Sequence, residues 1–238
     1  PDAEYYIYAA NSSNIDDYID NPFVEFNNAS KGVRNFSNQL IQKNKSSKSL
    51  FTSSGAVYGS TKNNSTYPKE FDIFLQNFSD DDPKKIYAQG KIDSENIFQN
   101  FSSNINRASI ARCFSFIGNF LPLDKHFAIG NFLLNIMRNE PIKFNSNIKV
   151  YRSYMHADDL VNWIMEILVN SDSSCPIYNV GSHEEFSLDE IAFNLGNHYG
   201  LDLDGKISNY DTFDRYVPNI DLGLEAGLNL TYNLKESF

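Results

Sequence analysis

The sequence has 238 residues, of which 41% are hydrophobic and 14% aromatic, and its formal net charge is -10. This length and apolar content suit a globular chain that buries a core, and they exclude a disordered one. The negative charge disfavours nucleic acid as a partner, because a phosphate polymer would be repelled on average. A small anionic ligand is still compatible with it, since a few placed arginines hold a diphosphate locally.

The cellular location is constrained by what the sequence lacks. No apolar stretch approaches the roughly 18 to 20 residues that cross a bilayer, so we expect no membrane association. The acidic start of the chain, Pro1–Glu4, does not resemble a signal peptide. The two cysteines, Cys113 and Cys175, have no metal-ligand spacing. We therefore predict free thiols, no metal site and a cytoplasmic location.

Short runs of β-forming residues alternate with helical patterns in the first half of the chain. The patterns predict strands over 5–10, 49–53 and 108–114, and helices over 22–41 and 83–101. Pro22 and Pro83 suit the first turns of those helices, where a missing N–H costs nothing.

The second half of the chain continues this alternation. Helices are predicted over 127–138, 156–169 and 187–199, and extended segments over 148–155 and 176–180. Ser187 and Glu190 have the spacing of a capping box at the start of the last helix. Strands that alternate with helices in this way indicate an α/β fold with a parallel sheet and right-handed crossovers.

The sharpest functional signal is a pair of segments that carry Ser54, Tyr87 and Lys91. Ser54 lies at the end of a predicted strand, and Tyr87 and Lys91 have i, i+4 spacing on a predicted helix. This spacing puts them on one helix face, about 6 Å apart along the axis. A nearby ammonium should lower the pKa of a phenol, whose usual value near 10 makes it a poor base at neutral pH. With a hydride acceptor close by, such a group interconverts an alcohol and a ketone.

The alternative is that Tyr87 and Lys91 are an ordinary aromatic residue and an ordinary cation on a helix surface. A Tyr-x-x-x-Lys pair alone is weak support for catalysis. Its combination with Ser54-Gly-Ala-Val-Tyr-Gly at a strand end favours the catalytic interpretation.

These segments resemble the extended short-chain dehydrogenase/reductase family that acts on sugar nucleotides. The resemblance covers nearly the whole chain and is far more specific for the family than for a substrate. Further matching segments are 6–10, Asn21-Pro22, 112–118, 152–160, 178–181 and 216–221.

The resemblance implies roles for individual residues, with NAD or NADP as the cofactor. Tyr87 would be the acid/base, Lys91 would bind the nicotinamide ribose and tune Tyr87, and Ser54 would orient the sugar hydroxyl. The implied cofactor-binding residues are Ala9, Ala10, Asn28, Ser53, Tyr87, Lys91 and Phe114.

The implied substrate is a nucleotide-linked sugar, bound by Ser54, Ser115, Arg152 and Arg215. Arg152, with Arg215, would contact its diphosphate. Two alternatives stay open: Arg152 pairs with Asp158 or Asp159, and Arg215 is a solvated loop cation. We interpret His156 as a structural hydrogen-bonding residue before a helix.

The resemblance also implies a domain organisation and a homodimer. Residues 1–118 would be the C-terminal half of a Rossmann-like dinucleotide-binding domain that carries the catalytic residues. Residues 119–238 would form a smaller C-terminal α/β substrate domain, with 148–181 partly interleaved with the first. The dimer would form through the helices near 22–41 and 83–101.

The chain departs from the family pattern because it has no Gly-x-Gly-x-x-Gly or Gly-x-x-Gly-x-x-Gly loop. In the family this loop cradles the pyrophosphate at a helix N-terminus. The sequence begins at what resembles the fourth strand, so we expect that roughly the first 60 to 80 residues of a family member are missing. The alternatives are a trimmed chain, a proteolytic product, a truncated gene product, or a segment outside the printed sequence. On its own, the chain is expected to bind NAD(P) poorly and to lack central strands of its sheet.

A second departure concerns the type of reaction. The family's 4,6-dehydratases place Asp and Glu directly after the catalytic hydroxyl residue, where this chain has Gly55 and Ala56. Neither side chain transfers a proton, so we expect an epimerase or reductase rather than a dehydratase. The alternative from another class is a truncated, catalytically silent chain that binds a nucleotide sugar or a partner subunit.

Overall fold

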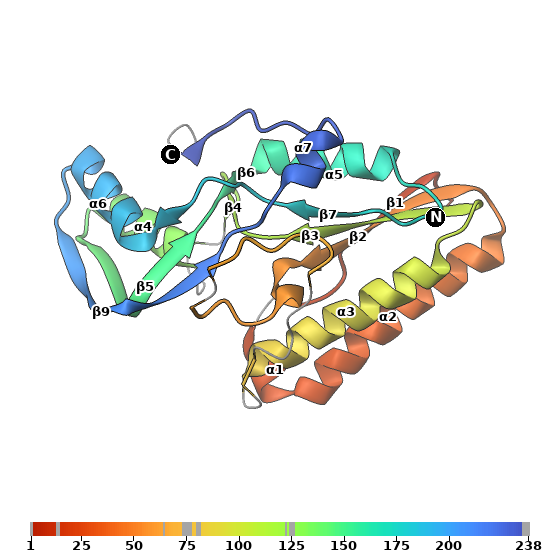
Figure 1. Cartoon of the computed structure of the whole chain (residues 1–238), viewed down its shortest axis with the longest axis horizontal. Coiled ribbons are helices and arrows are strands. Elements are labelled where there is room, and N and C mark those ends of the chain that lie inside the picture. The colour runs from red at the N-terminus through yellow and green to blue at the C-terminus, as the bar shows by residue number, and fades with distance from the viewer. Residues whose placement is uncertain are drawn as a thin grey trace.

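A computed structural model describes residues 2–12, 15–63, 65–72, 78–79, 82–121, 123 and 127–234. Figure 1 shows the arrangement of its elements: a central sheet lies between helical layers, and a second sheet extends from one end of it.

The central sheet has four parallel strands in the order β1-β2-β3-β7. Its strands are β1 (Tyr5–Tyr8), β2 (Ser47–Ser54), β3 (Asn106–Cys113) and β7 (Ile177–Val180). Because they are parallel, their carboxyl ends meet at one edge, where ligands bind in open α/β sheets. Ser54 and Cys113 are paired neighbours at this edge.

One face of this sheet is covered by α2 (Pro22–Lys43) and α3 (Pro83–Phe101), which pack side by side (Figure 1). Their apolar side chains bury Phe51 and Ile110 of the sheet completely. The short helix α1 (Ile15–Asp20) packs against the N-terminal part of this pair. The packing therefore brings one face of α3 against the carboxyl end of β2.

The opposite face is covered by α5 (Ala157–Val169) and by α7 (Asp221–Glu225), which packs near β7. Trp163 of α5 is buried against Leu50 and Val180 of the sheet. The predicted role of His156 is confirmed, since its Nδ1 accepts a hydrogen bond from the Asp158 backbone N–H at the start of α5.

A second sheet has the order β8-β5-β9 and packs against α4 and α6. These elements are β5 (Ile142–Arg152), β8 (Phe186–Ser187), β9 (Leu203–Tyr216), α4 (Ala128–Met137) and α6 (Leu188–Tyr199). The remaining short elements are the 3-10 helix η1 (Gly55–Tyr58) and the strands β4 (Phe116–Ile117) and β6 (Met155–His156). The domain boundary between 118 and 119 stays a prediction.

The mixed α/β architecture and the parallel sheet are confirmed. The half of the predicted capping box that Glu190 supplies is present at the start of α6, where its carboxylate accepts from the Ser187 N–H at 2.8 Å. The elements that were not predicted are α1, η1, α7, the short strands β4 and β8, and the long strand β9. Within the described residues, no helix is long and apolar enough to cross a membrane.

Candidate active site

Ser54 lies where β2 ends and η1 begins. Its backbone is extended, and its hydroxyl accepts a hydrogen bond from the Ala56 N–H at 3.2 Å, which caps the following turn. The Ser54 hydroxyl therefore joins the end of β2 to the turn that follows it.

Tyr87 and Lys91 lie on the face of α3 that packs against this strand end. The Lys91 ammonium is 5.7 Å from the centre of the Tyr87 ring, and it donates to the Thr52 carbonyl at 3.1 Å. The predicted proximity of the two side chains is confirmed. The ammonium also lies 5.3 Å from the centre of the Phe51 ring, which makes a cation–π contact.

The predicted direction of the Tyr87 pKa was wrong. Burial raises the pKa of the phenol above its ordinary value, and the interaction with the Ser54 side chain offsets a part of that rise. The physical reason is that the Lys91 ammonium is directed at the Thr52 carbonyl and the aromatic rings, so desolvation of the phenol dominates.

Lys91 is itself perturbed by its surroundings. Its side chain is only 6% exposed, and burial lowers its pKa from 10.5 to about 8, with Cys113 and Glu95 acting in the opposite direction. Perturbed ionisable groups of this kind are typical of functional sites, because burial tunes them for proton transfer or charge stabilisation.

Three site residues escaped sequence analysis: Tyr18, Cys113 and Tyr216. The Tyr216 side chain, at the end of β9, interacts with Ser54, and its ring lies 4.7 Å from that of Phe114. The buried Tyr18 packs edge-on against the Tyr87 ring at 5.1 Å. Tyr216 and Cys113 belong to segments that resembled the family, which was a signal, whereas Tyr18 carried none.

Gly55 has a steric reason to be glycine. A Cβ at this position would lie 2.7 Å from the Phe114 ring and 2.7 Å from the Tyr216 hydroxyl. The space beside Ser54 is thus filled by two aromatic side chains, and an acidic side chain does not fit there without rearrangement.

The residues predicted to bind the cofactor lie in different surroundings. Ala9 and Ala10 are exposed after β1, and Asn28 is exposed on α2, where its amide donates to Glu25 at 3.2 Å. Phe114 is buried between Gly55 and Gly181. The Ser53 hydroxyl instead donates to Glu95 at 2.5 Å, which directs it into a buried network.

A polar group without a partner lies near the first of these residues. Among the described residues, the buried Asn11 carboxamide, directly after Ala9 and Ala10, has no hydrogen-bond partner for its oxygen or nitrogen. Buried polar groups without a hydrogen-bond partner are rare, and each requires an explanation, such as a ligand that binds at that place.

The arginines predicted to bind the diphosphate each contact a carboxylate. Arg152 donates to Asp214 at 2.6 Å, so the alternative pairing with Asp158 or Asp159 was wrong. β9 pairs with β5 and brings Asp214 beside Arg152, a contact that the sequence did not reveal.

Arg215 was predicted to bind the diphosphate or else to be a solvated loop cation. It donates to Glu185 through Nε at 2.6 Å, and its guanidinium lies about 5 Å from the rings of Tyr151 and Phe213. It is therefore a strand residue held in an aromatic and acidic environment. Ser115 is half-buried, and its carbonyl accepts from the Met155 N–H at 3.0 Å.

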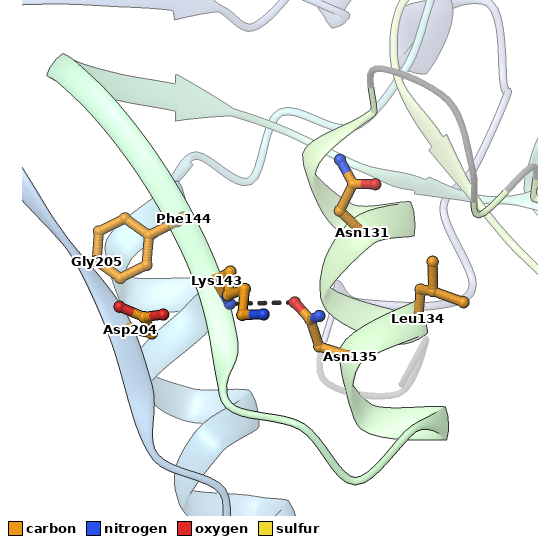
Figure 2. A pocket seen from close by; sticks show the side chains of 7 residues that line it. All are labelled: Asn131, Leu134, Asn135, Lys143, Phe144, Asp204 and Gly205. Carbon is orange, nitrogen blue, oxygen red and sulfur yellow. Dashed lines mark hydrogen bonds between the residues drawn. The ribbon is translucent and has the colours of Figure 1, made fainter.

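The surface is hollowed between α4, β5 and β9, at a place where no site residue was predicted (Figure 2). The hollow has a volume of about 790 Å³ and is lined by Asn131, Leu134, Asn135, Lys143, Phe144, Asp204 and Gly205. A smaller one of about 180 Å³ adjoins it along β5, where Phe144, Ser146, Ile148 and Val150 line it. In the described ranges, no three His, Cys, Asp or Glu side chains gather as a metal site.

A model of the NAD dependent epimerase/dehydratase family matches residues 1–181. The chain belongs to this family.

Relatives in this family share part of their length with the chain. UDP-glucuronic acid decarboxylases 4 and 1 of Arabidopsis thaliana are each 26% identical over 144 residues, which is 60% of this chain. The match spans 31% and 32% of the length of these curated relatives.

Solved structures share the fold over nearly all of the chain. UDP-glucose 4-epimerase of Thermotoga maritima with UDP-glucose has a TM-score of 0.81 at 17% identity, covering 98% of this chain and 74% of that one. RMD of Pseudomonas aeruginosa complexed with NADPH has a TM-score of 0.80 at 20% identity, covering 98% and 78%. At these identities the likeness shows the Rossmann-like fold.

Proposed function

We propose that the chain carries the catalytic and substrate-binding part of an NAD(P)-dependent epimerase or reductase that acts on a nucleotide-linked sugar. The observation that carries the proposal is the convergence of Ser54, Tyr87 and Lys91 at the carboxyl edge of the parallel sheet. Family membership supports the same reaction class.

The residues present fit the nicotinamide end of the cofactor. The orphaned Asn11 carboxamide and the perturbed Lys91 both lie at the carboxyl edge, where a polar ligand would satisfy them. Lys91 and Tyr87 would hold the nicotinamide ribose, with Ala9, Ala10, Asn28 and Phe114 around the bound group. A glycine loop for the pyrophosphate is not among the residues of this sequence.

The chain's own residues would manage the proton of the reacting hydroxyl. The nicotinamide, when bound, supplies the hydride acceptor and donor. Ser54 would hold the sugar hydroxyl by a hydrogen bond, and Tyr87 would take its proton as the carbon is oxidised and return a proton to the oxygen on reduction. The Lys91 ammonium would stabilise the phenolate form of Tyr87, which accepts the proton and is restored when the proton is returned.

The hollow along β5 supports a place for the nucleotide. Phe144, Ser146, Ile148 and Val150 alternate along one face of the strand, and the same alternation continues to Arg152. A nucleotide on this face would direct its diphosphate toward Arg152. The substrate sugar would then reach Ser54 and Tyr87 at the sheet edge.

The surroundings of Gly55 support epimerisation or reduction over 4,6-dehydration. Loss of water requires an acid and a base beside the reacting sugar, and the space next to Ser54 is filled by Phe114 and Tyr216.

The test is turnover with defined probes. The purified protein is incubated with NAD⁺ and, in turn, UDP-glucose, UDP-glucuronic acid and dTDP-glucose, and separately with NADPH and a 4-keto nucleotide sugar, while nicotinamide absorbance and sugar products are followed. We expect an epimerised or reduced nucleotide sugar. In Tyr87→Phe, kcat should fall by about 10²- to 10⁴-fold, because the proton-transfer group is lost.

Each other outcome selects a different function. A decarboxylated sugar from UDP-glucuronic acid would mean that the chain has the decarboxylase activity for which the Arabidopsis relatives are named. Binding of a UDP-sugar without any turnover would favour the catalytically silent alternative. Unchanged kcat in Tyr87→Phe would refute the role of Tyr87.

A further inference from the structure

Glu95 is a buried carboxylate on α3 that the proposed chemistry does not use. Its side chain is almost fully buried, and both of its oxygens are occupied. Oε1 accepts from the Ser53 hydroxyl at 2.5 Å and from Arg112 Nε at 3.0 Å, and Oε2 accepts from Arg112 Nη2 at 2.7 Å. The Arg112–Glu95 pair is therefore bidentate, a geometry that restricts orientation as well as distance.

Arg112 extends this contact to the turn that follows Ser54. The guanidinium is 2% exposed, and Nη1 donates to the Tyr58 hydroxyl at 3.0 Å and to the Glu70 carbonyl at 2.7 Å. Tyr58 in turn donates to Asn179 Oδ1 at 2.6 Å. The network thus joins α3, β2, η1, β3 and β7 beneath the carboxyl edge of the sheet.

The network contacts both halves of the candidate site. On α3, Tyr87, Lys91 and Glu95 repeat at i, i+4 and i+8, so they share one helix face. Around Ser54, the network binds Ser53, which precedes it, and Tyr58, which ends η1. The hydrogen bonds of Glu95 and Arg112 would therefore fix α3 relative to the segment around Ser54.

We propose that Glu95 is a positioning residue, which locks the face of α3 that carries Tyr87 and Lys91 to the strand end that carries Ser54. This inference rests on the proposed function. Positioning matters because a displacement of about 1 Å between reacting groups costs on the order of 10²-fold in rate.

Glu95 also acts on Lys91 through its charge. The ionisable groups that face Lys91 are Tyr87 and Glu95 from α3 and Cys113 from β3. Glu95 raises the pKa of Lys91 and so opposes the effect of burial. A merely structural carboxylate elsewhere in the core would have no such effect on the lysine.

The test is Glu95→Gln in the full chain, with two readouts. The first is kcat and KM against pH, with the cofactor and the nucleotide sugar that the wild type turns over. The second is the titration of the Lys91 amine, followed by competitive labelling with trace acetic anhydride and mass spectrometry, which needs no turnover. We expect kcat to fall by about 10- to 100-fold with KM little changed. The alkaline limb of the rate profile and the Lys91 titration should both move to lower pH.

Two further variants separate positioning from folding. Ser53→Ala removes one hydrogen bond and keeps the ion pair, so it should fold; its kcat should fall several-fold while KM for the cofactor stays the same. Asp159→Asn removes another fully buried carboxylate, which caps the N–H groups of Thr231 and Tyr232 far along the chain. It should lower the melting temperature and leave the pH profile unchanged.

The outcomes are distinguishable from failure of the proposed function. If the wild type turns over no nucleotide sugar, the proposed function fails, and an unshifted Lys91 titration in Glu95→Gln would overturn the coupling independently. If the wild type is active, the inference is overturned when Glu95→Gln has the same kcat and the same Lys91 titration as the wild type. If Glu95→Gln does not fold, an unchanged kcat in folded Ser53→Ala overturns it.

Discussion

At the scale of single residues, the Lys91 ammonium is the group of the candidate site whose burial lowers the stability of the fold most. Because burial lowers its pKa to about 8, the folded chain must hold a charge in the core at neutral pH. A depressed lysine pKa destabilises the fold fully below about pH 8, and the cost disappears as the pH rises toward 10.5.

We therefore predict that Lys91→Met is inactive and more stable than the wild type at pH 7, by up to about 3 kcal/mol. Chemical denaturation from pH 7 to pH 10 checks this, and the difference between the two proteins should shrink as the pH rises. Lys31→Met, at an exposed position of α2, is the control and should change stability little. A less stable Lys91→Met at pH 7 would mean that the contacts of Lys91 outweigh its desolvation.

The residue scale also shows how far local patterns reach. Ser54, Tyr87 and Lys91 were identified because their spacing is local to one strand end and one helix. The direction of the Tyr87 pKa was not predictable, since it depends on how deeply the packed helices bury the phenol. The orientation of the Ser53 hydroxyl was likewise not predictable, because it is bonded to Glu95, which only the packing of α3 brings close.

At the scale of elements, the pairing of β5 with β9 depends on a close backbone approach at Gly205. A Cβ there would lie 2.0 Å from the Phe144 carbonyl oxygen, so the strands must separate to accommodate it. This pairing is also what brings Asp214 and Tyr216 to the candidate site.

We predict that Gly205→Ala destabilises the protein by about 1 to 3 kcal/mol, because backbone rather than a flexible side chain is in the way. Gly90→Ala, in α3, is the matched control, since its Cβ would lie no closer than 3.7 Å to the nearest side chain, that of Phe26 in α2. It should stabilise the helix by about 0.5 to 1 kcal/mol. Thermal unfolding of both variants measures the contrast, and equal effects would contradict it.

Elements with a period or a cap were predictable, and β9 was not. The helix α6 begins at a capping box that the sequence displays, and α2 begins at Pro22. β9 instead contains Gly205 and many polar residues, and it lies at the edge of a three-stranded sheet. An edge strand needs little apolar alternation, so its sequence does not distinguish it from a loop.

At the scale of the whole molecule, an exposed apolar surface on α2 bears on how copies of the chain associate. The N-terminal part of α2 exposes apolar side chains, with Phe23 80% exposed and Val24 beside it. The predicted homodimer through α2 and α3 would cover such residues. It remains a proposal.

We predict that the purified protein sediments as a dimer and that Phe23→Asp shifts it toward the monomer, since a charge would be buried without a partner. Phe120→Asp, at an even more exposed position outside these helices, should leave the dimer unchanged. Analytical ultracentrifugation decides between them. A dimer that tolerates Phe23→Asp, or a monomeric wild type, would exclude this interface.

The sequence by itself determined the family, the parallel α/β fold and the closeness of Tyr87 to Lys91, because each depends on spacing within a single element or on a short motif. Only the tertiary structure decided the partners of these residues: Asp214 for Arg152, Glu185 for Arg215, and Glu95 for Ser53. Those contacts join segments far apart in the chain, and they form only when strand pairing and helix packing bring the segments together.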